Sequence, residues 1–147
     1  MNNESTNNKE LIVKSKTENL SAIRDFISRN ALSAGIKKDM IENIMLAVDE
    51  ACTNIIRHAY SSTPDGEIKI KLNYNLEKFT ILIIDYGNSF DPEIIPDPDL
   101  RKYYDEGKAG GLGMYLMKTL MDEVKYISVP GKYNQVFLSK NINESQN

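Results

Sequence analysis

The segment 67–85, EIKIKLNYNLEKFTILIID, decides which fold this chain can adopt. Its first part, 67–74, alternates apolar and polar side chains, which is the pattern of a β-strand with one buried face. Its last part, 79–85, is apolar almost throughout, as expected of a central strand that is covered on one face and crowded on the other. The residues NLEK between them predict a hairpin turn. The centre of the chain is therefore expected to form an antiparallel pair of strands.

Two helical patterns precede this hairpin. The first helix is expected to begin at a cap, Thr17 or Asn19, and to run to Ala34, and Gly35 stands where a glycine ends a helix. The second helix is expected over 37–60, because its apolar residues keep helical spacing for about five turns. These apolar residues are Ile41, Ile44, Val48, Cys52, Ile55 and Ala59.

The remaining segments add strands and a third helix. We expect a short strand at 10–14, a helix at 114–121 and a closing hairpin with strands at 124–129 and 135–141. The residues 86–110 contain Pro, Asp and Gly without periodicity, which is typical of a functional loop or a disordered segment. The order β-α-α-β-β-loop-α-β-β predicts an α+β fold. It is a two-layer α/β sandwich whose mainly antiparallel, mixed sheet carries three helices on one face.

Length and composition fit one ordinary globular domain. With 147 residues, 41% hydrophobic and 27% charged, we expect a single domain over 1–147 with disordered tails at 1–8 and 143–147. The net charge of −3, without a block of like charges, gives no support for nucleic-acid or membrane-surface binding. The single cysteine, Cys52, excludes an intrachain disulfide and a cysteine-rich metal site. The polar N-terminus and the lone cysteine lead us to expect a cytoplasmic protein.

Four of the eight glycines gather within 107–113, directly before the helix expected at 114–121. Glycine lets backbone approach a ligand closely, and the free N–H groups at a helix N-terminus bind anions. Lys108 is a candidate partner for a phosphate. The spacing does not match a P-loop, and Leu116 stands where G-x-G-x-x-G requires its third glycine. A phosphate-binding hinge and a flexible surface loop both remain open at this point.

Polar residues recur four apart on the long helix. Glu50, Asn54 and His58 form one stripe away from the apolar face, and the small Ala47 and Ala51 fall between stripe and core. An amide oxygen suits a hard cation such as Mg²⁺, and a carboxylate one turn away can orient a nucleophile or accept its proton. A solvated polar face would show the same spacing, and we assign His58 no catalytic role.

Asp85 ends the apolar strand, where an unpaired charge is costly, and Gly87 follows closely. A carboxylate at the edge of a sheet can accept a hydrogen bond from an exocyclic amine, and Gly87 would leave room for a flat ring. The alternative is an aspartate that hydrogen bonds to the backbone of its own turn.

Together, three stretches resemble the three boxes of the GHKL ATPase superfamily. DEACTNIIRHAY (49–60) resembles its N box, IDYGNSFDP (84–92) its first glycine box, and GGLGMYLM (110–117) its second. Within the superfamily, the chain is most similar to the small bacterial anti-sigma-factor serine kinases, from about residue 10 to residue 141. Three boxes in the expected order, with the same order of strands and helices, make this resemblance specific.

The resemblance implies a role for each matching position. Glu50 would be the general base that activates the incoming hydroxyl, and Asn54 would bind Mg²⁺ against the triphosphate of ATP. Asp85 would accept a hydrogen bond from the adenine amino group, with Gly87 beside the ring. The remaining implied nucleotide-binding positions, in and before the lid hinge, are Lys108, Gly110, Gly111 and Gly113.

The function implied is an anti-sigma factor with ATP-dependent serine kinase activity towards a STAS-domain anti-anti-sigma protein. A sigma factor and a second copy of the chain are the other implied partners, and ATP and Mg²⁺ the cofactors. A nucleotide-binding module that sequesters partners without phosphorylating them is the alternative, although Glu50 favours a kinase because a pure binder needs no base. The catalytic part of a histidine kinase is disfavoured, since His58 lies inside the N box. The three boxes likewise disfavour a structural protein that binds no nucleotide.

The chain departs from the family pattern at two places. Ala109 and Gly110 stand where members often carry Arg or Ser, and Lys108 is the substitute that the sequence offers for a γ-phosphate contact. Asn134 and Gln135 stand near the start of the last strand, where many members have a threonine that contacts adenine through water. We therefore expect the adenine contact to be lost or altered.

Overall fold

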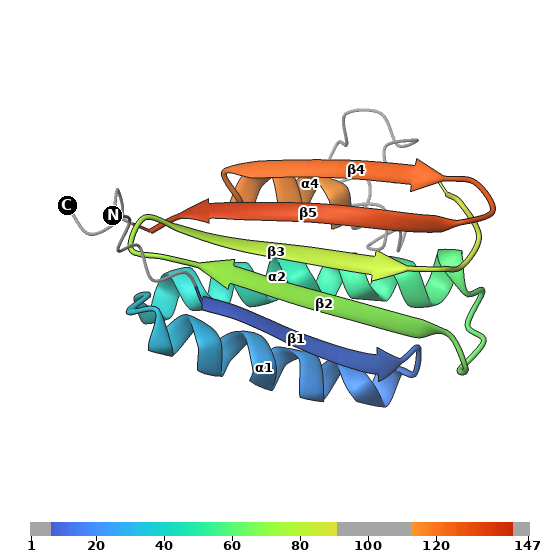
Figure 1. Cartoon of the computed structure of the whole chain (residues 1–147), viewed down its shortest axis with the longest axis horizontal. Coiled ribbons are helices and arrows are strands. Elements are labelled where there is room, and N and C mark those ends of the chain that lie inside the picture. Colours follow the sequence, from blue (N-terminus) through green and yellow to red (C-terminus); the bar gives the residue numbers. More distant parts are fainter. Residues whose placement is uncertain (1–6, 91–112, 143–147) are drawn as a thin grey trace, which may run out of the picture.

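The computed structural model describes residues 7–90 and 113–142, which form two layers (Figure 1). One layer is a five-stranded sheet in the order β1-β2-β3-β5-β4, and the other consists of helices on one of its faces. The strands are β1 (Asn7–Lys14), β2 (Glu67–Tyr74), β3 (Lys78–Asp85), β4 (Glu123–Val129) and β5 (Tyr133–Asn141). The helices are α1 (Leu20–Ser33), α2 (Lys38–Asn54) and α4 (Gly113–Leu120), with short turns η1 (Thr17–Asn19) and η2 (Ile55–Ala59).

This is the two-layer α+β sandwich that the sequence predicts, with one correction to the sheet. All four neighbouring strand pairs are antiparallel within the described part of the chain, so the sheet is not mixed. β1 also begins at Asn7, because Asn7 and Asn8 pair with the end of β2. The predicted disordered head, 1–8, is therefore wrong for these two residues. The other predicted tail residues, 1–6 and 143–147, lie outside the described residues.

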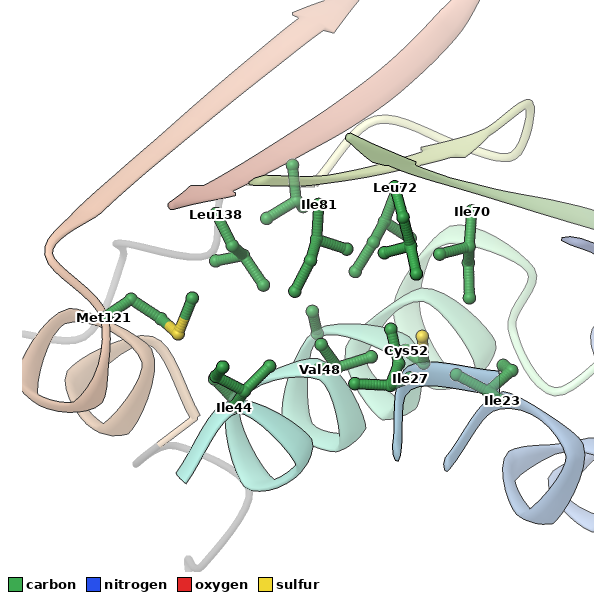
Figure 2. Close-up of a cluster of buried hydrophobic side chains, with 14 of the residues drawn as sticks. Ile23, Ile27, Ile44, Val48, Cys52, Ile70, Leu72, Ile81, Met121 and Leu138 are labelled. Carbon is green, nitrogen blue, oxygen red and sulfur yellow. The ribbon is translucent and has the colours of Figure 1, made fainter. Parts of the chain in front are cut away.

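The core lies between the sheet and helices α1, α2 and α4 (Figure 2). Every second residue of β2 and β3 is buried on this face, as the alternation predicts, and Ile70, Leu72 and Ile81 point towards the helices. Burial of each large aliphatic side chain stabilises the fold by roughly 1.5–3 kcal/mol, so α2 is held firmly against the sheet. The residues of α2 and η2 predicted to be apolar and inward are all buried: Ile41, Ile44, Val48, Cys52, Ile55 and Ala59.

The ends of helix α1 confirm one prediction and correct another. Gly35 follows the helix with a φ of +81°, the left-handed conformation expected of a terminating glycine. The predicted side-chain cap is absent, because Asn19 donates its amide to the carbonyl oxygen of Lys14 at 2.9 Å instead. Thr17 is part of the turn η1 and does not cap the helix.

One end of the sandwich collects the polar residues of interest. The end of β3, the start of β5, the end of β4 and the C-terminal end of α2 meet there (Figure 1). The strand register places Asn134 opposite Asp85 across β3 and β5, and opposite Ser128 across β4 and β5. The topology therefore brings three polar side chains from distant parts of the sequence to one place.

Candidate functional site

Asp85 is the most deeply buried carboxylate of the described residues, with 1% of its surface exposed. It is the last residue of β3, and strand alternation directs its side chain towards the helices. Its Oδ1 accepts two hydrogen bonds, from the amide of Gly87 at 3.0 Å and from Nδ2 of Asn134 at 2.8 Å. Burial raises the pKa of the Asp85 carboxyl, and these two hydrogen bonds lower it in part. Among the described residues, no donor reaches the second oxygen, Oδ2.

The structure shows one of the two sequence interpretations of Asp85 directly, and the other, recognition of an exocyclic amine, stays a prediction. The bond from Gly87 is the local turn contact that was the alternative interpretation. The bond from Asn134 spans 49 residues and joins two strands in a buried setting, which a simple turn aspartate does not require. The carboxylate is therefore built into the sheet and the turn at the same time.

Asn134 is equally buried, and its amide is saturated with hydrogen bonds. Besides Asp85, its Nδ2 donates to the carbonyl oxygen of Asn88 at 3.0 Å, while its Oδ1 accepts from the Ser128 hydroxyl at 2.6 Å. The Ser128 oxygen also lies 2.8 Å from that of Ser89. Because Ser128 has one hydroxyl proton and Asn134 Oδ1 can only accept, Ser89 must supply the proton of this last bond. In the sequence, Asn134 stands out as a departure from the family pattern, but nothing there indicates that it forms a hydrogen bond with Asp85.

The turn after Asp85 packs directly on the end of the long helix. A Cβ added to Gly87 would lie 2.4 Å from the carbonyl oxygen of Ala59, so only glycine fits this contact. The amide of Asn88 donates to the same oxygen at 2.7 Å, and the hydroxyl of Tyr60 accepts from the amide of Tyr86 at 2.8 Å. The structure therefore gives Gly87 a packing reason that the sequence interpretation, room for a flat ring, did not include.

Asn54 is the last residue of α2 and precedes η2, whose final residue, Ala59, contacts this turn. Asn54 is 8% exposed, and its side-chain amide forms no hydrogen bond with another described residue. After Asn54 the helix widens into the π-helical turn η2, in which the amide of Tyr60 donates to the carbonyl oxygen of Ile55 at 3.0 Å. Such turns are frequent at functional sites.

Glu50 lies one turn before Asn54 and is half-buried. Burial is the largest cause that raises the pKa of the Glu50 carboxyl, and the charge of Asp49 raises it further, while Arg57 lowers it in part. A carboxylate with a raised pKa is a stronger base, because it gains more from accepting a proton. This is the property that the sequence interpretation requires of Glu50.

His58 does not continue the stripe of Glu50 and Asn54. The regular spacing ends where η2 begins, and the ring of His58 instead lies 5.6 Å from that of Phe90. The ring of Phe90 in turn lies 5.6 Å from that of Tyr126 on β4. Three aromatic rings thus connect the helix end, the turn after Asp85 and the edge strand.

Some expected features lie outside this arrangement. Gly113 begins α4, whereas Lys108, Gly110 and Gly111 lie outside the described residues. The small Ala47 and Ala51, which fall between the polar stripe and the core in sequence, are both buried in the core. Within 7–90 and 113–142, no group of three or more His, Cys, Asp or Glu could hold a metal ion.

A groove of about 520 Å³ lies on the open face of the sheet, away from Asp85. Strands β1, β2, β3 and β5 line it, and it includes none of the predicted site residues. The site therefore rests on the contacts around Asp85 and not on this groove.

Comparison with known proteins identifies the family of this fold. The model of the histidine kinase-like ATPase domain family matches residues 13–140 of the chain. The chain belongs to this family. The matched region of this ATPase domain spans every helix and strand after the first part of β1, and it includes Glu50, Asn54 and Asp85.

Curated relatives of this histidine kinase-like ATPase domain carry a more specific name. The chain is 38% identical to the serine-protein kinase RsbW of Bacillus subtilis (strain 168) over 121 residues, which cover 79% of this chain and 75% of the relative. It is 36% identical to the serine-protein kinase RsbW of Listeria monocytogenes serovar 1/2a over 140 residues, or 92% and 88% of the two chains. The protein of the same name from Bacillus licheniformis is 39% identical over 117 residues, or 75% and 71%. No described helix is long and apolar enough to cross a membrane.

Proposed function

We propose that this protein is an ATP-dependent protein serine kinase that uses Asp85 for adenine, Asn54 for the metal-bound phosphates and Glu50 as the base. The observation that carries the proposal is the state of Asp85, a buried carboxylate with one oxygen held by protein donors. Relatives named serine-protein kinase, at 36–39% identity over most of the chain, support the class of reaction.

Asp85 is suited to recognise an aminopurine. Its Oδ2 accepts no hydrogen bond from a described residue, so it can accept one from an exocyclic amine. A purine with an oxo group at the same place would instead set an acceptor against a carboxylate. Leaving a buried charged group without its hydrogen bond is costly, so the site should prefer adenine over a 6-oxopurine.

Asn54 is suited to a Mg²⁺ ion that is shared with phosphates. Mg²⁺ in nucleotide sites takes one or two protein oxygens and completes its octahedron with phosphate oxygens and water. The open amide of Asn54 fits this requirement, as does the lack of a larger acidic cluster among the described residues. When bound, Mg²⁺ neutralises charge on the triphosphate. Lys108, Gly110 and Gly111 stay predictions for the phosphates, and Gly113 does so at the start of α4.

Glu50 performs the proton transfer in this proposal. It accepts the proton of the substrate serine hydroxyl while the serine oxygen forms a bond to the γ-phosphorus. The bond between that phosphorus and the bridging oxygen breaks, and ADP leaves with the electron pair. Its raised pKa makes Glu50 a stronger proton acceptor than an exposed glutamate.

The partners follow from the resemblance noted above. We propose a STAS-domain anti-anti-sigma protein as the phosphate acceptor, a sigma factor as the sequestered partner, a homodimer as the working form and the cytoplasm as the location. The chain is proposed to act as one ATP-binding domain. A nucleotide-binding regulator without kinase activity is the second candidate, and it is favoured only if the wild type binds ATP but transfers no phosphate.

A phosphoryl-transfer assay tests the proposal. Purified protein is incubated with Mg²⁺, γ-labelled ATP and a STAS-domain partner, and the label on partner serine is measured. Glu50→Gln should bind ATP as the wild type does but transfer little phosphate, whereas the matched control Glu42→Gln, an exposed residue of the same helix, should transfer normally. Label-free partner with intact ATP binding by the wild type would reject the kinase and leave the second candidate.

A further inference from the structure

The amide of Asn134 does more than fill space beside Asp85. Its Nδ2 bridges the carboxylate and the backbone of the turn that follows, with donor distances of 2.8 Å to Asp85 Oδ1 and 3.0 Å to the Asn88 carbonyl. The amide cannot be rotated by half a turn, because its oxygen would then face a carboxylate and a carbonyl, which only accept hydrogen bonds.

Ser128 fixes this orientation from the other side. Its hydroxyl donates to Asn134 Oδ1 at 2.6 Å, and Ser89 lies 2.8 Å further along the same chain of hydrogen bonds. The chain runs from the turn through β4 and β5 to the end of β3, and its last acceptor is Asp85 Oδ1. Both amide protons of Asn134 are therefore engaged in hydrogen bonds, and Asp85 Oδ1 already accepts two, from Gly87 and Asn134. A donor on a ligand would accordingly bind to Oδ2.

We propose that Asn134 is a positioning residue that presents Asp85 to the nucleotide as an ionised carboxylate with a single open oxygen, and that Ser128 and Ser89 hold Asn134 in the required orientation. This inference rests on the proposed function for its ligand, a purine with an exocyclic amine. It deepens that function, because it names a residue whose hydrogen bond favours the ionised form of the adenine-binding group.

The surroundings of Asp85 contain no cation that could take over this role among the described residues. On β2 the residue paired with Asp85 is Ile68, and the charge of Asp85 contributes to raising the pKa of the Cys52 thiol on α2 and of the Tyr60 hydroxyl after η2. Burial raises the pKa of the Cys52 thiol and of the Tyr60 hydroxyl, so both keep their protons well above neutral pH. The pKa of the Asp85 carboxyl is therefore governed by its burial, which raises it, and by its two hydrogen-bond donors, which lower it.

The test compares Asn134→Leu, which keeps the shape but removes the donor, with Asn134→Thr, which retains one donor. The carboxyl ¹³C resonance of Asp85 is titrated in nucleotide-free protein, and the dissociation constant of Mg-ATP is measured across the same pH range. In Asn134→Leu, the Asp85 carboxyl should titrate at higher pH than in the wild type. This variant should bind ATP roughly tenfold more weakly than the wild type at the acid end of the range, and this difference in affinity should shrink at high pH. Asn134→Thr should lie between the two, and the matched control Asn73→Leu, at an exposed asparagine of β2, should match the wild type.

The outcomes separate this inference from the proposed function. An Asp85 titration that is unchanged in Asn134→Leu would overturn the positioning role, even if affinity fell equally at every pH. Should Asn134→Leu fail to fold, Ser128→Ala and Asn134→Thr carry the test, and titrations identical to the wild type in both would overturn it. A wild type that binds no nucleotide would reject the proposed function, while the carboxyl titration would still report on Asn134.

Discussion

Gly87→Ala is the substitution whose effect the structure defines most sharply. The added Cβ would lie 2.4 Å from the oxygen and 2.6 Å from the carbon of the Ala59 carbonyl, and both are backbone atoms. Ordinary contact begins near 3.4 Å, so the turn must move away from the helix end by about 1 Å. That movement breaks the 2.7 Å hydrogen bond from Asn88 to Ala59 and disturbs the bond from Gly87 to Asp85.

The expected cost combines overpacking with one lost hydrogen bond, which amounts to roughly 3 kcal/mol. For a chain of this length, about 1 kcal/mol corresponds to roughly 3 °C, so Tm should fall by about 9 °C. Differential scanning calorimetry and urea unfolding measure the two quantities. Gly131→Ala is the matched control, because nothing lies within 4 Å of its added Cβ and only its φ of +80° is unfavourable. It should cost about 1 kcal/mol. A Gly87→Ala protein as stable as the wild type would refute the packing of this turn on the helix.

The surroundings of Glu50, Cys52 and Tyr60 lead to three further predictions. The rate of phosphoryl transfer should rise with pH as Glu50 loses its proton. Asp49→Asn should shift this rise to lower pH, because it removes a negative charge that raises the pKa of Glu50. An unshifted pH profile would show that another group is the base. Cys52 should not react with a thiol reagent at pH 8 until the protein unfolds, since burial raises the pKa of its thiol, and rapid labelling of native protein would contradict this. Tyr60→Phe should lower the free energy of unfolding, measured by urea denaturation, by about 1–2 kcal/mol, because the amide of Tyr86 and the carbonyl of Glu67 both lose their hydrogen-bond partner. The control Tyr133→Phe, at an exposed site, should change this free energy little.

Periodicity predicted most of the fold because each pattern here reflects one buried face. The spacing from Ile41 to Ala59 identified the long helix, and the alternation in β2 fixed which face meets it. The predictions failed where a local contact replaced the expected one. Asn19 donates to Lys14 and so does not cap α1, and the π-helical turn removes His58 from the stripe that regular spacing predicted.

The site was predictable only in part, for a related reason. Asp85 was recognisable as a candidate because an unpaired charge at the end of an apolar strand is costly. Its partner Asn134 was not, because the two residues are 49 positions apart and meet only through the register of β3 and β5. Ser128 joins them through the register of β4 and β5, which no local pattern specifies. The space next to Gly87 is filled by Ala59, a contact that depends on where the helix ends.

The most direct test of the account is the nucleotide specificity of Asp85→Asn, measured by calorimetry with Mg-ATP and Mg-ITP. In this variant the side-chain oxygen can still accept from Gly87 and Asn134, while an NH₂ group replaces the open Oδ2. Affinity for ATP should fall more than tenfold, and ITP, whose purine carries an oxo group, should bind better than ATP. The loss should not come from unfolding. Burial raises the folded-state pKa of Asp85, so the folded protein loses stability as pH rises through that pKa and the carboxyl ionises. The variant cannot ionise at this position and should therefore be at least as stable as the wild type at pH 7.5. A folded Asp85→Asn protein that binds ATP like the wild type would contradict the account.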